Sequence, residues 1–329
     1  MLLAGCVVQF GIVCPTGWSY GWAMVSFKPW RPEAFLRLGL GILACVFMGG
    51  LGSTCLRWAQ AGANVNALLL AGVVAGGFVS LGTALGVTWR PWPLEARRHR
   101  LMIFLVSLYA GLLFMSVSYR LMPAAAGQPT SGQMVIAGLS FQGATLVLVG
   151  RFLREHGCSW GEGFGFDRGR WRAVGLGLLT ALAVLPVAWL LQLAVMTGLA
   201  HLKLETEAQA AVEVLRASPT WVARLPIGVV AVVLAPPAEE ALFRGVLYPA
   251  LKQAGCSRLA WWGSALLFAA VHWNLPSFLP LVLLALVLVW LYEKTGNLLA
   301  PIAAHALFNA LNFVALQFYD WFSAPPPAT

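Results

Sequence analysis

Long apolar runs separated by short polar loops dominate the chain. A transmembrane helix requires roughly 20 consecutive apolar residues, and most of the runs approach or exceed that length. The predicted helices occupy residues 34–56, 64–88, 101–122, 132–153, 173–200, 222–250, 259–273, 279–293 and 298–319, with residues 1–27 as a further candidate. The pattern therefore predicts an all-α fold, a polytopic transmembrane helical bundle of about eight to ten spans.

Composition and charge agree with a membrane protein. Of the 329 residues, 60% are hydrophobic and 10% are charged, whereas soluble domains carry about a quarter charged residues. The net charge of +9 comes from loops such as 89–100 and 151–172, and every second loop is basic. This is the positive-inside pattern of membrane topology. We expect an integral membrane protein in contact with the lipid bilayer, with those loops in the cytoplasm, and no nucleic acid partner.

The chain divides into four regions. Residues 1–150 supply N-terminal transmembrane helices to which the sequence assigns no role, and residues 151–172 form a basic cytoplasmic loop. Residues 173–320 contain the chemistry-bearing spans, and the proline-rich tail, 321–329, is expected to be disordered. The stretch 203–219 alternates at helical spacing, which predicts an amphipathic helix on the opposite membrane surface.

Four ionisable side chains lie deep within apolar runs of the second half. Glu239 and Glu240 are the two carboxylates so placed, and His272 and His305 are the two embedded imidazoles. Such residues are costly within a membrane and are functional candidates by default. At about 1.5 Å of rise per residue, Glu239, His272 and His305 lie about 20, 21 and 17 Å from the basic loops. We therefore predict that three spans bring them to one layer.

Spacing within the helix separates the roles of the two glutamates. Glu240 and Arg244 are four residues apart, so they share a helix face and can pair, which lowers the cost of both charges. Glu239 points about 100° away and is expected to remain free of Arg244. Pro236 and Pro237 remove backbone donors just before the glutamates and should kink or interrupt the span.

The histidines have partners at the same spacing. Phe268 precedes His272 by one turn, and Asn309 follows His305 by one turn. These side chains suit hydrolysis, because Glu239 can act as general base for water and an imidazole can orient that water or bind a metal that activates it. A second histidine with an asparagine can supply hydrogen bonds to the oxyanion of a tetrahedral intermediate.

Three motifs carry a family resemblance. "EEALFR" at 239–244, "FAAVH" at 268–272 and "HALFN" at 305–309 resemble the EExxxR, FxxxH and HxxxN motifs of the CPBP family. These are the CAAX-protease and bacteriocin-processing (ABI) intramembrane endopeptidases, related to the type II CAAX prenyl endopeptidase. The resemblance covers roughly residues 175–320 and leaves the first 150 residues unexplained.

The resemblance implies an enzyme, a membrane-embedded endopeptidase that hydrolyses a bond of a membrane-associated peptide or protein, in a bacterial cell (inner) membrane. Glu239 would activate the water, His272 would hold it, and His305 and Asn309 would stabilise the oxyanion. Glu240, Arg244 and Phe268 would support the site. The family is described both as metal-dependent and as metal-independent, so the cofactor is either none or Zn²⁺, with Glu239, His272 and His305 as possible ligands.

Two other classes of function remain open from the sequence. A proton-coupled transporter could use the same buried carboxylates, although the inverted repeats that are common in transporters are not evident. A non-proteolytic membrane scaffold or immunity protein could retain the motifs without using them. Loss of cleavage, loss of transport or an unchanged phenotype on mutation of Glu239 distinguishes the three.

Overall fold

The computed structural model describes residues 30–60, 67–121, 130–204, 209–218 and 220–323, and within these ranges the chain forms helices and no strand. The α-helices are α1 Pro32–Gln60, α2 Ala67–Trp89, α3 Arg97–Arg120, α4 Ser131–Gly138, α5 Ala144–Glu155, α6 Trp160–Phe164, α7 Arg170–His201, α8 Ala210–Ala217, α9 Trp221–Val229, α10 Ala235–Glu240, α11 Tyr248–Gln253, α12 Ser257–Ala270, α13 Leu275–Thr295 and α14 Leu299–Ser323. A 3₁₀-helix, η1 (Leu94–Ala96), precedes α3, and three π-helical segments, η2 (Leu139–Gly143), η3 (Val230–Leu234) and η4 (Ala241–Leu247), lie within longer helical stretches.

The polytopic helical fold is confirmed. Eight helical stretches of the described residues are long and apolar enough to cross a membrane, within the predicted range of eight to ten. The candidate span at 1–27 lies outside the described residues. The predicted span 259–273 is wrong as a full crossing, because α12 has 14 residues, fewer than the roughly 20 that a crossing requires. It is followed by a turn and forms a hairpin with α13.

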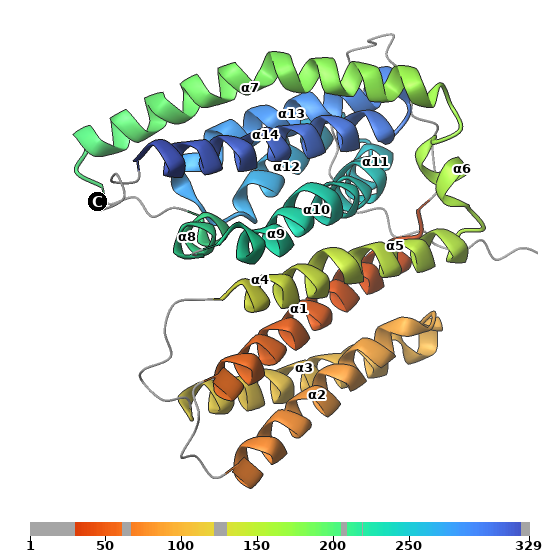
Figure 1. Ribbon diagram of the computed structural model, residues 1–329. Helices are drawn as coiled ribbons and strands as arrows, with labels where there is room; N and C mark the ends of the chain where they lie inside the picture. The colour runs from red at the N-terminus through yellow and green to blue at the C-terminus, as the bar shows by residue number, and fades with distance from the viewer. Residues whose placement is uncertain (1–29, 61–66, 122–129, 205–208, 219, 324–329) are drawn as a thin grey trace, which may run out of the picture.

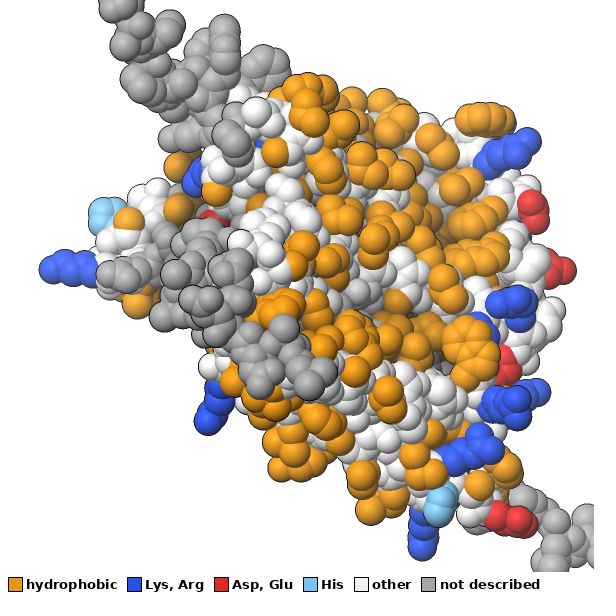
Figure 2. Space-filling model, turned by 60° about the horizontal axis from the view of Figure 1, so that its bottom comes forward, with side chains coloured by type: hydrophobic (Ala, Val, Ile, Leu, Met, Phe, Trp, Pro, Cys, Tyr) orange, Lys and Arg blue, Asp and Glu red, His pale blue; other side chains and the backbone are white. Residues whose placement is uncertain are grey.

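The helices of the second half of the chain pack against those of the first half (Figure 1). Helices α7, α13 and α14 pack together on one side, and α2 and α3 form a hairpin on the other. Between them, the helical stretch 221–253 lies against α4 and α5. Figure 2 shows a broad apolar surface with charged side chains gathered towards two opposite edges, as a bilayer-embedded protein requires.

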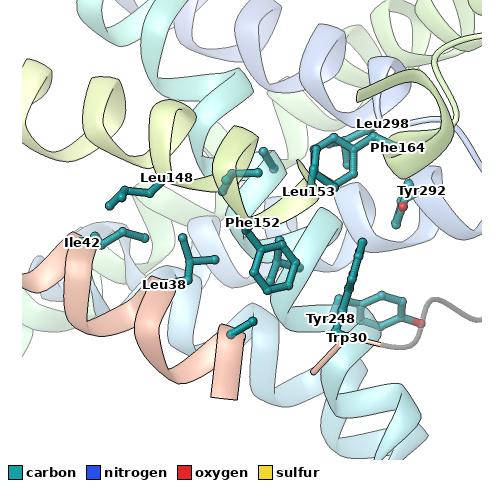
Figure 3. Close-up of a cluster of buried hydrophobic side chains, with 14 of the residues drawn as sticks. Trp30, Leu38, Ile42, Leu148, Phe152, Leu153, Phe164, Tyr248, Tyr292 and Leu298 are labelled. Carbon is teal, nitrogen blue, oxygen red and sulfur yellow. The ribbon is translucent and has the colours of Figure 1, made fainter. Parts of the chain in front are cut away.

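A buried cluster joins the two halves at one end of the molecule (Figure 3). Leu38 of α1 and Phe152 of α5 belong to it, as do Tyr248 of α11 and Tyr292 of α13. The cluster continues into α6, where Phe164 is fully buried and its carbonyl accepts the Leu298 N–H at 2.9 Å. The middle of the second half of the chain is therefore fixed to the N-terminal helices through a common core.

Glycines permit close approach between several of the helices. Lipid tails are as apolar as leucine, so membrane helices associate largely through packing that small residues permit. A Cβ added to Gly177 of α7 would lie 2.2 Å from the Ala300 carbonyl oxygen of α14. A Cβ on Gly138 would lie 2.5 Å from Val230 Cγ1. The second contact brings η3 against the helix of the N-terminal half that contains η2.

The shorter predicted features are found in part. Helix α8 lies within the predicted 203–219 segment and buries Val214 and Leu215 while exposing Glu213 and Arg216, so it is amphipathic. Of the predicted tail, residues 321–323 are helical within α14, because the apolar pattern continues into them. Residues 324–329 lie outside the described residues.

The predicted basic loop, 151–172, contains the end of α5 and the short helix α6. Ser159 caps α6 through a reciprocal pair of hydrogen bonds with Glu162. The Ser159 backbone N–H and hydroxyl both donate to the Glu162 carboxylate, and these hydrogen bonds lower the pKa of Glu162.

Candidate active site

The two glutamates lie on α10, in the middle of one helical stretch that runs from Trp221 to Gln253. Both are buried, with Glu240 fully enclosed. The sequence predicted that Pro236 and Pro237 kink or interrupt the span, but the helical stretch continues through them. Instead, the hydrogen-bond register changes on both sides of α10, where η3 and η4 are π-helical. Single π-helical turns within α-helices occur frequently at functional sites.

Asn309 compensates for one consequence of this register change. The Ala235 N–H bonds to the Val230 carbonyl rather than to Ala231, its partner in an α-helix. The next residue, Pro236, has no N–H to offer. The Ala231 carbonyl therefore lacks both local donors, and the Asn309 side-chain amide of α14 donates to it at 2.9 Å. Asn309 thereby fixes α14 against η3.

Glu240 is the centre of a buried network. Its Oε1 accepts from Arg244 Nη1 at 2.8 Å and lies 2.9 Å from His305 Nδ1. The guanidinium also donates to the Ala285 carbonyl at 3.1 Å and lies over the Phe268 ring at 4.5 Å. The predicted Glu240–Arg244 pair is therefore present. Because an ionised carboxylate only accepts hydrogen bonds, the geometry assigns a proton to His305 Nδ1, and in the neutral imidazole Nε2 is then an acceptor.

Glu239 has different neighbours from Glu240. Its Oε2 lies 3.9 Å from His305 Nε2, and its Oε1 accepts from Gln142 Nε2 at 3.5 Å. No Lys or Arg of the described residues lies within ion-pair distance of it, in keeping with the expectation that Glu239 remains free of Arg244. The two oxygens of Glu239 thus face two different helices, α14 and the η2 segment.

His272 lies just beyond the end of α12, in the turn before α13. Its Nδ1 is 2.7 Å from the Phe268 carbonyl oxygen, which can only accept, so Nδ1 carries the proton and Nε2 is the acceptor. The Phe268 ring lies between the two histidines, with centroid distances of 5.0 Å to His272 and 5.7 Å to His305. Phe268 is fully buried and so fixes both imidazoles.

The structure brings together most of the side chains that the motifs singled out. Glu239, Glu240, Arg244 and His305 meet directly, Phe268 packs against Arg244 and both histidines, and Asn309 binds the η3 backbone. His305, rather than His272, is the imidazole that lies beside Glu239.

Sequence reasoning missed Gln142. This neutral amide in an apolar run has no periodic or charged signal, and its contact with Glu239 spans 97 residues of sequence. The expectation that the chemistry lies in the second half alone therefore omits one contributor to the site.

The donor set does not fit a metal ion in this arrangement. Structural and catalytic zinc sites use at least three protein ligands at about 2.0–2.3 Å. Across the described ranges, no group of three or more His, Cys, Asp or Glu side chains could hold a metal. The Nδ1 atoms of His305 and His272 face Glu240 and a backbone carbonyl, which leaves both Nε2 atoms free, but within the described part of the chain these atoms and the Glu239 carboxylate do not form a group of three ligands. The possible ligand set Glu239, His272 and His305 is not assembled, and no step below uses a metal.

The Glu239 carboxylate, the His305 imidazole and the Glu240–Arg244 ion pair are enclosed between helices of a membrane protein. The protein therefore belongs to the class of helical membrane proteins that have an ionisable site within the membrane. Residues 219–311 match the family model of the type II CAAX prenyl endopeptidase Rce1-like proteins. The family resemblance of the three motifs is therefore confirmed over this segment, which matches a family of membrane proteases. The matched segment contains α9 to α13 and about the first half of α14.

Two curated relatives match over shorter segments. The chain is 34% identical over 85 residues to the uncharacterized protein YpbD of Bacillus subtilis, which covers 25% of this chain and 41% of that protein. It is 28% identical over 91 residues to the UPF0177 protein YxdF of Lactococcus lactis, which covers 27% of this chain and 50% of that protein. The chain thus spans half or less of the relatives that it matches. No solved structure matches it significantly.

Proposed function

We propose that the protein is an intramembrane endopeptidase that hydrolyses a peptide bond of a membrane-associated protein or peptide with a water molecule activated by Glu239. The observation that carries the proposal is the pairing of an oriented imidazole with a buried carboxylate that has no Lys or Arg of the described residues within ion-pair distance. Glu239 Oε2 and His305 Nε2 are 3.9 Å apart, too far for a hydrogen bond. One water at about 2.8 Å from each atom fits that separation.

The tautomer of His305 suits this arrangement. With its Nδ1 proton donated to Glu240, the imidazole accepts from the water at Nε2, while Glu239 accepts the other water proton. Both water protons are then bound, and an oxygen lone pair is available for the substrate carbonyl carbon. As the new C–O bond forms, Glu239 takes one proton, and it delivers that proton to the amide nitrogen when the C–N bond breaks.

The remaining motif residues take supporting roles in this proposal. Asn309 uses one N–H on the Ala231 carbonyl, and its second N–H is the donor proposed for the oxyanion. His272 supplies a second imidazole across the Phe268 ring from His305, with Nε2 as its open atom. Glu240 and Arg244 hold His305 in place. The proposed location is a bacterial cell membrane, in keeping with the two bacterial relatives.

The test is peptide cleavage by the purified protein in proteoliposomes, with a peptide library and with or without chelator. Glu239→Gln keeps the size and removes the base, so cleavage should fall by about 10²–10⁴-fold while the circular dichroism spectrum is unchanged. Glu213→Gln makes the same chemical change on the exposed face of α8 and should cleave like the wild type. Retained cleavage in Glu239→Gln rejects the proposal, and uptake of a solute that Glu239→Gln abolishes supports a transporter instead.

A further inference from the structure

The N-terminal half contributes one side chain to the proposed site, although the Rce1-like match begins only at residue 219. Gln142 belongs to η2, the π-helical segment between α4 and α5. This segment lies against α10 and η3, where Gly138 permits the close approach to Val230. Gln142 thereby extends its amide to the carboxylate of Glu239.

The direction of this hydrogen bond follows from its chemistry. A glutamine amide presents either its NH₂ or its oxygen, and an ionised carboxylate is an acceptor only. The orientation in which Gln142 Nε2 faces Glu239 Oε1 is therefore favourable, and the flipped orientation would place two acceptors in contact. Gln142 can distinguish the two oxygens of Glu239, because Oε1 accepts from the amide and Oε2 faces His305.

A second buried polar side chain lies close to Gln142 in the sequence. Thr145 belongs to the first turn of α5, directly after the η2 segment that contains Gln142. Thr145 is 1% exposed, and its hydroxyl has no hydrogen-bond partner within the described ranges. Gln142 is half-buried, and its Oε1 atom is likewise buried without a partner in those ranges. Buried unpartnered polar atoms are costly, and within a membrane span they indicate a functional surface.

We infer that Gln142 is a positioning residue for the proposed reaction: it fixes the rotation of the Glu239 carboxylate so that Oε2 faces the water held by His305. This inference rests on the proposed function. It also makes the N-terminal helices part of the site, because the base is oriented from outside the Rce1-like segment. Without the amide, the carboxylate can rotate, and fewer molecules present an oxygen in the reactive direction.

The decisive variant is Gln142→Met, because methionine has nearly the length and shape of glutamine and lacks the amide. We expect kcat to fall about tenfold with KM unchanged, since the substrate is bound as before and only the base is misdirected. Ser140→Ala is the matched control. It also removes a polar group from η2, but Ser140 faces Gly49 of α1, and it should keep the wild-type kcat.

The outcomes separate the inference from the proposed function. No cleavage by the wild type, or full cleavage by Glu239→Gln, rejects the proposed function. Wild-type kcat in Gln142→Met, when Glu239→Gln is inactive, overturns the inference alone, as does an equal loss in Ser140→Ala. The contact is also measured without substrate, by a double-mutant cycle of unfolding free energies for Gln142→Met and Glu239→Leu. A significant coupling free energy supports the inference, and a coupling of zero overturns it whatever the activity.

Discussion

The Glu240–Arg244 pair offers a prediction in which buried charge is the dominant contribution. Both side chains are fully buried, their closest atoms are 2.8 Å apart, and Glu240 also bonds His305. Removing one partner from a buried ion pair leaves an uncompensated charge and costs about 3–5 kcal/mol. We therefore expect Arg244→Met to lower the free energy of unfolding by that amount, and Glu240→Gln to lower it comparably.

The double variant is the informative one. With Glu240→Gln and Arg244→Met together, no buried charge remains from the pair, and the Gln side-chain oxygen still accepts from His305 Nδ1. The unfolding free energy should therefore recover most of the loss that either single variant shows. Such a recovery is a coupling free energy of several kcal/mol, above the 0.5–3 kcal/mol typical of residues in contact, because the whole penalty of an unpaired charge is removed.

The assay is reversible unfolding in mixed micelles by titration with a denaturing detergent, followed by tryptophan fluorescence and circular dichroism. Arg97→Met is the matched control, because it breaks the Arg97–Glu33 pair, whose atoms are 3.3 Å apart and whose side chains are 45% and 23% exposed. An exposed pair contributes about 0–1 kcal/mol. Strictly additive effects of Glu240→Gln and Arg244→Met, or an Arg244→Met loss no larger than that of Arg97→Met, would refute the reasoning.

Two further predictions concern the glycines that bring helices together. Gly177→Ala should lower the free energy of unfolding by about 1–3 kcal/mol, because its Cβ would lie 2.2 Å from the Ala300 backbone oxygen. The control is Gly175→Ala, which has nothing within 4 Å of its Cβ and should be neutral or slightly stabilising. Equal effects of the two variants in the same detergent titration would contradict this packing. Gly138→Ala should lower both the free energy of unfolding and the rate of cleavage, because its Cβ would push η2 away from η3 at Val230. Adding Val230→Ala should restore both quantities, and a double variant no better than Gly138→Ala would show that Val230 is not the obstacle.

The sequence predicts the spans well because a membrane helix has a strong length and hydropathy signal. It predicts the Glu240–Arg244 pair for a local reason, since residues four apart on a helix meet. Both inferences use information within one helix. The π-helical segments beside α10 leave no periodic signal, so the sequence suggested a kink where the structure changes hydrogen-bond register.

The predicted span 259–273 is wrong because the helix ends before His272. The depth estimate for His272 assumed a helix throughout 259–273, yet α12 ends at Ala270, and Asn274 begins α13 by accepting the Ser277 N–H. Asn274 followed by Pro276 is a signal for a helix start that the apolar run concealed. Distances between helices cannot be obtained from depth alone, and this is why the structure was needed to show that His305 is the neighbour of Glu239.

The different treatment of the two adjacent glutamates is the strongest argument that the site performs chemistry. A carboxylate within the bilayer is unfavourable, and Glu240 is stabilised by a fully buried arginine and by a histidine. Glu239, one residue earlier, receives a long amide hydrogen bond and an imidazole nitrogen beyond hydrogen-bond distance. If both carboxylates only stabilised helix packing, we would expect similar partners for the two, yet Glu240 pairs with Arg244 and Glu239 has no Lys or Arg of the described residues within ion-pair distance. Because Glu240 Oε2 is also buried without a hydrogen-bond partner among the described residues, the distinction lies in the surroundings: Glu239 faces the Nε2 atom of His305, and no guanidinium holds its charge.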